Sequence, residues 1–222
     1  MVPTGNGRNI ILFGPPGVGK GAQAQILSHH HHLSHLSTGE VIRNEIGRES
    51  PLGLRVKDAV SRGEFADDET VLGIVMSVID QPEYQRGFVT DGFPRTVHQA
   101  ELFDALLARR GRKVSFALFM EAPEETILKR LAGRRICASC GSTYHKEFKR
   151  PRIHGICDTC KGKVVRRHDD NPTTHRDRLR TYYEKTLPLS EYYRKAGNLV
   201  IINGNQTVDE VAAEIEKTIY GT

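Results

Sequence analysis

The sequence predicts an α/β fold in three layers, in which a central parallel sheet of about five strands lies between two layers of helices. Five short apolar segments alternate with longer segments of helical periodicity. Parallel strands need crossover connections, and this alternation places the crossover helices on both faces of one sheet. The expected strands are residues 9–13, 33–36, 87–90, 114–120 and 198–202.

Two further features belong to this prediction. A glycine-rich segment, residues 14–20, follows the first strand directly. Two segments interrupt the alternation, a helical one at residues 37–66 and one at residues 133–170 that contains all four cysteines. We therefore expect one core over residues 1–222 that carries two inserts.

The glycine-rich segment, Gly-Pro-Pro-Gly-Val-Gly-Lys, fits the phosphate-binding pattern G-x-x-x-x-G-K. It joins the strand at 9–13 to a helix expected at 21–28, so the backbone N–H groups of Gly17, Val18, Gly19 and Lys20 can point into one concavity. The N-terminus of the helix adds partial positive charge, and Lys20 supplies a full charge. This arrangement predicts a polyphosphate site; the alternative is a Gly/Pro-rich turn in some other α/β protein.

The residues after the lysine depart from the usual pattern. A Ser or Thr normally follows and ligates Mg²⁺, whereas here Gly21 and Ala22 follow. We therefore expect no direct hydroxyl ligand at this position. Asp91 stands at the carboxyl end of the strand at 87–90, where an acid suits contact with Mg²⁺ through water.

A run of four histidines, His29 to His32, ends the first predicted helix, and His35 lies nearby. Histidine-rich segments can bind metal, but histidine is also favourable at a helix C-terminus. We favour the second interpretation, a solvated helix end.

The remaining helices follow from periodicity and capping signals. Ser37 and Glu40 form a capping-box pattern, which predicts a helix that starts there and ends before Pro51. Pro188 predicts that the long helical segment near the C-terminus is divided in two. The other expected helices are residues 54–62, 68–81, 96–110, 124–131, 173–195 and 207–220.

The cysteines form two Cys-x₂-Cys pairs, Cys137 with Cys140 and Cys157 with Cys160, separated by sixteen residues. This spacing matches a four-thiolate zinc site. Four protein ligands leave no open coordination position, so we expect structural Zn²⁺ rather than catalytic metal. A redox function is the alternative, but one pair would be enough for it.

Composition narrows the class of protein. With 38% hydrophobic and 27% charged residues, the chain is expected to be globular, and no apolar run reaches the 18 residues of a membrane span. The N-terminus lacks the charged and apolar regions of a signal peptide, so we expect a cytoplasmic protein. The net charge of +5 is concentrated in residues 133–170, with ten Lys and Arg against four Asp and Glu.

Five motifs together resemble the adenylate kinase family, from Ile10 to about Val211, and most closely its bacterial form with a long, zinc-binding lid. In that family the reaction is Mg·ATP + AMP ⇌ 2 ADP. The motifs are Gly-Pro-Pro-Gly-Val-Gly-Lys-Gly at 14–21, Ser-Thr-Gly-Glu at 37–40, Asp-Gly-Phe-Pro-Arg-Thr at 91–96 with Gln99, Gly-Arg-Arg at 133–135 and Arg-His-Asp-Asp at 167–170.

The resemblance implies a role for individual residues. The ATP site would comprise Gly17, Val18, Gly19, Lys20, Gly21 and Ala22, with Arg134, Thr143 and Tyr144 covering ATP and Gln206 near its adenine. The AMP site would comprise Thr38, Arg43, Glu64, Phe65, Ala66, Gly92, Phe93, Pro94, Arg95, Gln99, Arg167 and Arg178. The catalytic set would be Lys20, Asp91, Arg95, Arg130, Arg134, Arg167 and Arg178.

The chemistry of the reaction agrees with such a set. Phosphoryl transfer between two nucleotides requires dense positive charge and exclusion of water, and AMP needs no general base because its phosphate is already a nucleophile. Arginine suits the task because its planar fork binds two phosphate oxygens. The inserts at 37–66 and 133–170 would be the AMP-binding segment and the lid that close over the nucleotides.

Two other functions remain open at this point. A UMP or CMP kinase would share residues 91–95, but its lid is usually short and lacks zinc; the long lid and Thr38 with Gln99 favour AMP. A phosphate-loop protein that binds nucleic acid through a basic zinc ribbon would need more aromatic residues than Tyr144 and Phe148. We expect ATP, AMP and ADP as partners, no nucleic acid or membrane, and a monomer. Ala22 stands where the family usually has Thr, which is expected to weaken ATP binding modestly.

Overall fold

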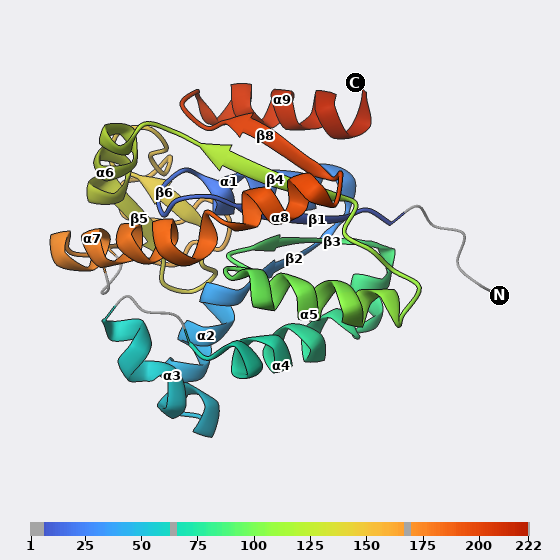
Figure 1. The fold of residues 1–222 in the computed structure, drawn as a ribbon. Coiled ribbons are helices and arrows are strands. Elements are labelled where there is room, and N and C mark those ends of the chain that lie inside the picture. The colour runs from blue at the N-terminus through green and yellow to red at the C-terminus, as the bar shows by residue number, and fades with distance from the viewer. Residues whose placement is uncertain (1–6, 63–65, 167–169, 222) are drawn as a thin grey trace.

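The computed structural model describes residues 7–62, 66–166 and 170–221, and its centre is a five-stranded parallel sheet (Figure 1). The strands lie in the order β2-β3-β1-β4-β8. Their bounds are Asn9–Phe13 for β1, Ser34–Ser37 for β2, Phe88–Asp91 for β3, Phe116–Glu121 for β4 and Leu199–Asn203 for β8. The predicted sheet is confirmed, and each strand lies within two residues of its expected bounds.

Helices cover both faces of this sheet, as the alternation predicts (Figure 1). Their bounds are Lys20–His31 for α1, Thr38–Gly47 for α2, Pro51–Ser61 for α3, Asp68–Ile79 for α4, Val97–Ala108 for α5, Glu124–Gly133 for α6, Pro172–Thr181 for α7, Leu189–Lys195 for α8 and Val208–Tyr220 for α9. Two short segments, η1 (Pro82–Arg86) and η2 (Tyr182–Thr186), complete the helical elements.

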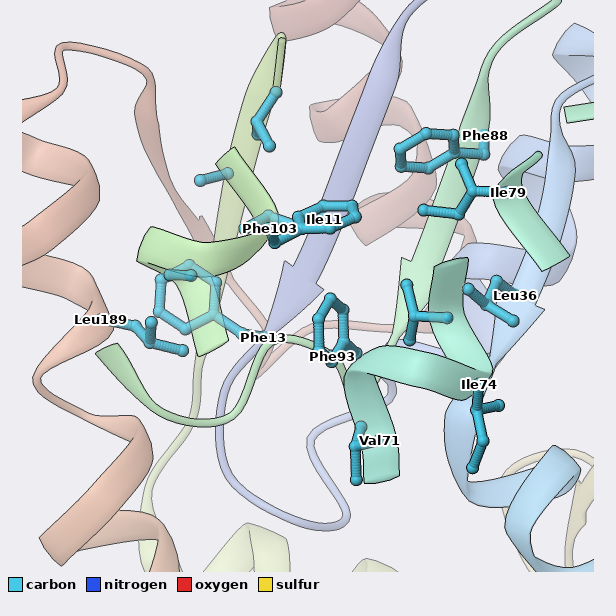
Figure 2. Packing of buried hydrophobic residues seen from close by; sticks show 14 of the residues in the cluster. Ile11, Phe13, Leu36, Val71, Ile74, Ile79, Phe88, Phe93, Phe103 and Leu189 are labelled. Atoms are coloured by element: carbon cyan, nitrogen blue, oxygen red, sulfur yellow. The ribbon is translucent and has the colours of Figure 1, made fainter. Parts of the chain in front are cut away.

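Strand β1 shows why the sheet is buried on both sides. Ile11 and Phe13 face the cluster that α4, α5 and α8 cover, while Ile10 and Leu12 face α1 and α9. All four side chains are buried, so the strand is a continuous apolar run rather than an alternating one. Figure 2 shows the first cluster, with Phe93 beside Phe103 of α5.

The strand register brings three loops together at one edge of the sheet. Asp91, the last residue of β3, pairs with Leu12 of β1 on one side and with Ser37 of β2 on the other. The chain leaves these strands at Gly14, Thr38 and Gly92, which therefore lie side by side. Ligands of open α/β sheets bind at this carboxyl edge.

The cysteine-containing insert forms a second, smaller sheet. Its strands are β5 (Arg134–Cys137), β6 (Thr143–His145) and β7 (Val164–Val165), paired antiparallel in the order β6-β5-β7. Its buried residues Cys137, Tyr144 and Cys157 form a cluster separate from the main core. So small a cluster buries little apolar area, which agrees with the expectation that metal holds this segment together.

Two helix boundaries differ from the predictions. Helix α2 ends at Gly47, before Pro51 as predicted, but α3 starts at Pro51 rather than at residue 54, because the Ser50 hydroxyl accepts the N–H of Gly53 and proline needs no partner in a first turn. The division near Pro188 begins earlier, as the π-helical segment η2. There the Leu187 N–H donates to Tyr182 O, five residues back, which widens the helix ahead of the proline.

The predicted capping box at Ser37 and Glu40 is wrong. Ser37 is the N-cap of α2, but its side chain makes no capping hydrogen bond. Glu40 instead lies against Gly141 in the cysteine-containing insert, where a Cβ on that glycine would stand 2.5 Å from Glu40 Oε1. A capping box does form at Thr207 and Glu210, at the start of α9.

The histidine run ends α1, as expected. His30 and His31 do more than face solvent, since His30 Nδ1 lies 2.7 Å from Glu216 Oε1 of α9 and His31 stacks on Tyr220 at 3.7 Å between ring centroids. The run therefore holds α1 against the C-terminal helix. Among the described residues, no helix is both long and apolar enough to cross a membrane.

Candidate functional site

A cleft of about 1240 Å³ lies at the carboxyl edge of the main sheet. The phosphate loop, the first turn of α2, the loop after β3 and the start of α9 form its walls, and the small sheet covers it. Every predicted nucleotide-site residue that the structure describes lines this cleft, except Phe93. Long-range folding thus gathers residues from Gly14 to Val211 around one space.

The glycines of the phosphate loop are required by the backbone. Gly14, Gly17 and Gly19 have φ values of 142°, 87° and 117°, which L side chains rarely adopt. A Cβ on Gly14 would stand 2.3 Å from the carbonyl oxygen of Met120 on β4. The loop can therefore bend tightly over the sheet and lead into α1, whose N-terminus faces the cleft.

Lys20 lies beneath this loop. Its Nζ donates to the carbonyl oxygens of Gly14 and Pro15, both at 2.9 Å. Burial lowers the pKa of Lys20 to about 8, although the Asp91 carboxylate acts in the opposite direction. Arg95 and Arg134 add to the lowering. Burial disfavours the charged form of Lys20, so an anion bound in the cleft would stabilise that form.

Asp91 lies next to the position where other phosphate loops carry a hydroxyl. A Cβ on Gly21 would stand only 3.0 Å from Asp91 Oδ2. Because the carboxylate already occupies this neighbourhood, the absence of a Ser or Thr has a structural reason. Asp91 is half-buried and faces the cleft, so its oxygens suit a hydrated divalent cation.

A hydrogen-bonded unit around Gly92 forms the other half of the cleft. Thr38 Oγ1 donates to Gly92 O at 2.9 Å, and Arg95 Nε donates to the same oxygen at 2.7 Å. Burial lowers the pKa of Arg95 to about 10; Asp91 opposes this, and Arg178 and Arg43 add to it. Three arginines therefore share one part of the cleft, which predicts a bound anion there.

Gln99 is held in place by two contacts. Its Oε1 accepts the N–H of Arg95 at 2.7 Å, and its Nε2 donates to Asp68 Oδ1 at 2.7 Å. The side chain is 1% exposed and still lines the cleft. A buried amide fixed in this way presents a defined edge, as discrimination between bases requires.

Arg130 joins two loops at the opposite end. Its Nη1 donates to Val18 O at 3.0 Å and to Gly204 O at 2.6 Å, and its Nη2 donates to Gln206 O at 3.0 Å. The guanidinium thus ties the phosphate loop to the segment that precedes α9. Its place near the transferring group stays a prediction, since its described contacts are with backbone carbonyl oxygens.

Asp170 anchors two other arginines. Its carboxylate, only 1% exposed, accepts Arg134 Nε at 2.8 Å and a second nitrogen of the same fork, and it lies 3.2 Å from Arg178 Nη1. His175 Nε2 lies 3.5 Å away. A buried carboxylate with several cationic partners fixes their orientation, so Arg134 and Arg178 reach the cleft from one rigid point.

Comparisons with known proteins agree with the family resemblance of the sequence motifs. A sequence profile of the adenylate kinase family matches residues 12–198. The chain is 41% identical to an adenylate kinase of Clostridium tetani over 211 residues, which cover 95% of this chain and 98% of that one. It is 39% identical to an adenylate kinase of Acetivibrio thermocellus and 38% to one of Clostridium novyi, each over 96% of this chain and 98% of the relative.

The chain belongs to the adenylate kinase family. Its function is that of an adenylate kinase, a phosphotransferase that moves a phosphoryl group reversibly between ATP and AMP. The sequence resemblance and the predicted phosphate-loop fold are thereby confirmed.

Three predicted residues of the adenylate kinase site, Glu64, Phe65 and Arg167, lie outside the described residues. Phe93 needs a correction. Its side chain is fully buried and meets Phe103 edge-to-face at 5.0 Å between centroids, so it belongs to the core and does not line the cleft. The apolar ring packs in the core and does not face the polar cleft, whereas its neighbours Gly92 and Pro94 line the cleft.

The four cysteines of this adenylate kinase meet in the small sheet. All four Sγ atoms lie within 4.8 Å of one another, with Cys137–Cys160 at 3.4 Å and Cys140–Cys157 at 3.6 Å. Zn–S bonds of about 2.3 Å give a tetrahedron with edges of roughly 3.8 Å. The sulfurs are too far apart for disulfides and all four cysteines are free, so the donor set fits a metal ion.

Sequence reasoning missed two residues of the site. His35 lines the cleft, and burial lowers its pKa against the opposing effect of Asp91 and Glu40. Asp170 stood in a recognised motif without an assigned role. A single histidine gives no usable signal, whereas a carboxylate next to several arginines in a basic segment is a signal that could have been used.

Proposed function

We propose that the two halves of the cleft bind the two nucleotides separately. ATP would place its phosphates on the N–H groups of residues 17–22 and on Lys20, with its adenine near Gln206. This is supported by the loop glycines at positive φ and by the pKa of Lys20, about 8, which a polyphosphate would raise. Thr143 and Tyr144 of the small sheet would cover ATP from above.

AMP would occupy the half around Gly92. Arg43, Arg95 and Arg178 would hold its phosphate, while Thr38, Ala66, Pro94 and Gln99 would surround the nucleoside, together with the predicted residues that lie outside the described part of the chain. The support is the convergence of three guanidinium groups in one region, whose mutual effect on pKa is already evident at Arg95.

The reaction in this arrangement needs positioning rather than covalent participation. An oxygen of the AMP phosphate attacks the γ-phosphorus, the bond to the β–γ bridging oxygen breaks, and its electrons pass to the departing ADP. Lys20 and the arginines would balance the charge that spreads over the equatorial oxygens. A Mg²⁺ ion bound with ATP would neutralise part of this charge, and Asp91 would hold its water ligands.

We propose that residues 37–66 and 133–170 close over the cleft as two covers. Glu40 of α2 touches Gly141 of the small sheet, and Thr143 lies near Gly21, since a Cβ on that glycine would stand 3.8 Å from Thr143 Cγ2. These contacts support a closed arrangement that must open to admit nucleotides. Because residues of one chain line the whole cleft, we propose that the monomer is active.

The pH dependence of ATP binding tests the place of Lys20. Only the protonated lysine attracts phosphate, and its pKa without ligand is about 8. The dissociation constant of ATP should therefore rise roughly tenfold between pH 7.5 and pH 9, because affinity falls tenfold for each pH unit above the pKa. Isothermal calorimetry measures this directly. The Lys20→Arg variant does not titrate in this range and should give a flat profile; a flat profile in the unaltered protein contradicts the assignment.

Gln99→Ala tests the AMP half. Loss of the amide should raise KM for AMP about fivefold to tenfold, since a neutral hydrogen bond contributes about 1 kcal/mol, and should leave KM for ATP within a factor of two. Steady-state kinetics with each nucleotide varied in turn gives both values. His98→Ala, the exposed neighbour on α5, is the matched control. Equal changes for both nucleotides would place Gln99 elsewhere.

Cys157→Ser tests the metal centre, which we propose holds structural zinc. Four thiolates leave no position for substrate, so the metal should stabilise the small sheet and take no part in transfer. The variant should lose about one equivalent of zinc and melt at a lower temperature. Below that temperature it should keep much of its turnover. Metal analysis and calorimetry provide the measurement; a folded but inactive variant, or unaltered protein with a disulfide and no metal, rules out this role.

A further inference from the structure

The hydroxyl of Tyr144 contacts a cysteine of the small sheet. Although the residue lines the cleft, its hydroxyl lies within the small sheet, where it donates to Cys157 Sγ at 3.3 Å. The same oxygen accepts the N–H of Asp158 at 2.8 Å. Tyr144 is 6% exposed and Cys157 is fully buried, so this chain of contacts is sheltered from water.

We propose that Tyr144 is a positioning residue of the metal centre, whose hydroxyl orients Cys157 and stabilises its bound thiolate. This inference rests on the structural metal site proposed above. A metal-bound sulfur is more negative than a thiol and is a correspondingly better acceptor, and hydrogen bonds to such ligands hold them in place for the ion.

The cost of burial supports this assignment. A phenolic O–H that loses water on folding needs an acceptor, and a neutral thiol sulfur is a weak one. A thiolate makes the same contact charge-assisted, so the environment of Tyr144 suits a charged sulfur. The Asp158 N–H on the other side fixes the phenol oxygen, and Asp158 Oδ1 in turn accepts the N–H of Arg152 at 2.9 Å.

The other ligands have weaker or more exposed partners. The Ser139 N–H donates to Cys137 Sγ at 3.4 Å, and Ser142 Oγ lies 3.1 Å from Cys140 Sγ in a part-buried contact. Tyr144 is distinct because its ring forms part of the small hydrophobic cluster with Cys137 and Cys157. One residue therefore supplies both apolar packing and a hydrogen bond to a ligand, and the same residue is among those that line the cleft.

The test is the rate at which zinc leaves the full-length, zinc-loaded protein in the presence of excess chromogenic chelator. Tyr144→Phe keeps the ring and removes the hydroxyl, so zinc should leave about 10–100-fold faster. Tyr183→Phe is the matched control, because that hydroxyl is near the surface and contacts Glu124 at 3.3 Å, and its zinc should leave at the unaltered rate. Release from Tyr144→Phe at the unaltered rate overturns the inference.

A second measurement does not depend on the variant folding. When ¹¹³Cd replaces zinc in the unaltered protein, the Tyr144 hydroxyl proton should show scalar coupling to the metal through the Cys157 sulfur. A hydroxyl resonance without this coupling overturns the inference. Unaltered protein that binds neither zinc nor cadmium would instead refute the proposed metal site itself, so the two failures are distinguishable.

Discussion

Replacing Lys20 with Met is expected to lower turnover by about a hundredfold or more. The methionine keeps the apolar stem but removes the charge beneath the phosphate loop, where Nζ lies 2.9 Å from two loop carbonyls. A single charged contact to a transition state contributes about 3 kcal/mol, which corresponds to this loss. Turnover of ATP and AMP at saturation is the measurement.

The expected loss should be confined to catalysis and ATP binding. Burial already disfavours the charged lysine in the absence of ligand, so Lys20→Met should be at least as stable to heat as the unaltered protein. Lys195→Met, an exposed residue of α8, serves as the control and should keep full activity. Near-normal turnover of Lys20→Met would contradict the assignment of the loop as the ATP site.

Arg134→Lys is the second substitution expected to have a large effect, with a loss of turnover of about a hundredfold. The charge is retained, but a lysine cannot reproduce the planar fork that faces Asp170 with two nitrogens and also reaches the cleft. Transition-state contacts made by such a fork are lost in kcat more than in KM. Steady-state kinetics separates the two constants.

The same substitution should also reduce stability. Asp170 is buried and would keep Arg178 but lose part of its hydrogen bonding, at a cost of about 2 kcal/mol. Thermal unfolding measures this, and circular dichroism checks that the variant is folded in the assay. Arg180→Lys, exposed on α7, is the control for a change of the same chemistry. A kcat within threefold of the unaltered value would exclude a catalytic role for Arg134.

The fold was predictable because its signals are local and strong. The apolar run at 9–13 is buried on both faces of the sheet, and such runs with helical segments between them permit few topologies. The phosphate loop was equally accessible, since its glycines are imposed by φ and by the close approach of Met120. The cysteine spacing predicted the cluster of four sulfurs, because two residues between the sulfurs of each pair fix their geometry locally.

Features that depend on tertiary contacts were harder to predict. Ser37 and Glu40 fit the capping pattern, yet Glu40 contacts Gly141, a residue 101 positions away in the turn between β5 and β6. Phe93 lies in a motif of predicted site residues, but its side chain is apolar and is buried in the core. A local sequence pattern does not show which residues far along the chain will contact a given side chain.

The roles of Arg130 and Tyr144 show the same limit. The family resemblance implies that both lie near the nucleotides, but it does not reveal that Arg130 binds three carbonyl oxygens or that the Tyr144 hydroxyl reaches Cys157. These contacts join segments that are 13 to 112 residues apart. Only the folded chain shows that each of these side chains also binds another part of the protein.

The most direct test of the whole account is a coupled assay that follows ADP formation from ATP with AMP, UMP, CMP or GMP as the acceptor, in parallel reactions with Mg²⁺. The arrangement around Thr38, Gly92 and Gln99 predicts rapid turnover with AMP and a kcat/KM at least about a hundredfold lower for the other three. Equal or higher activity with UMP or CMP would contradict the assignment of this half of the cleft to AMP.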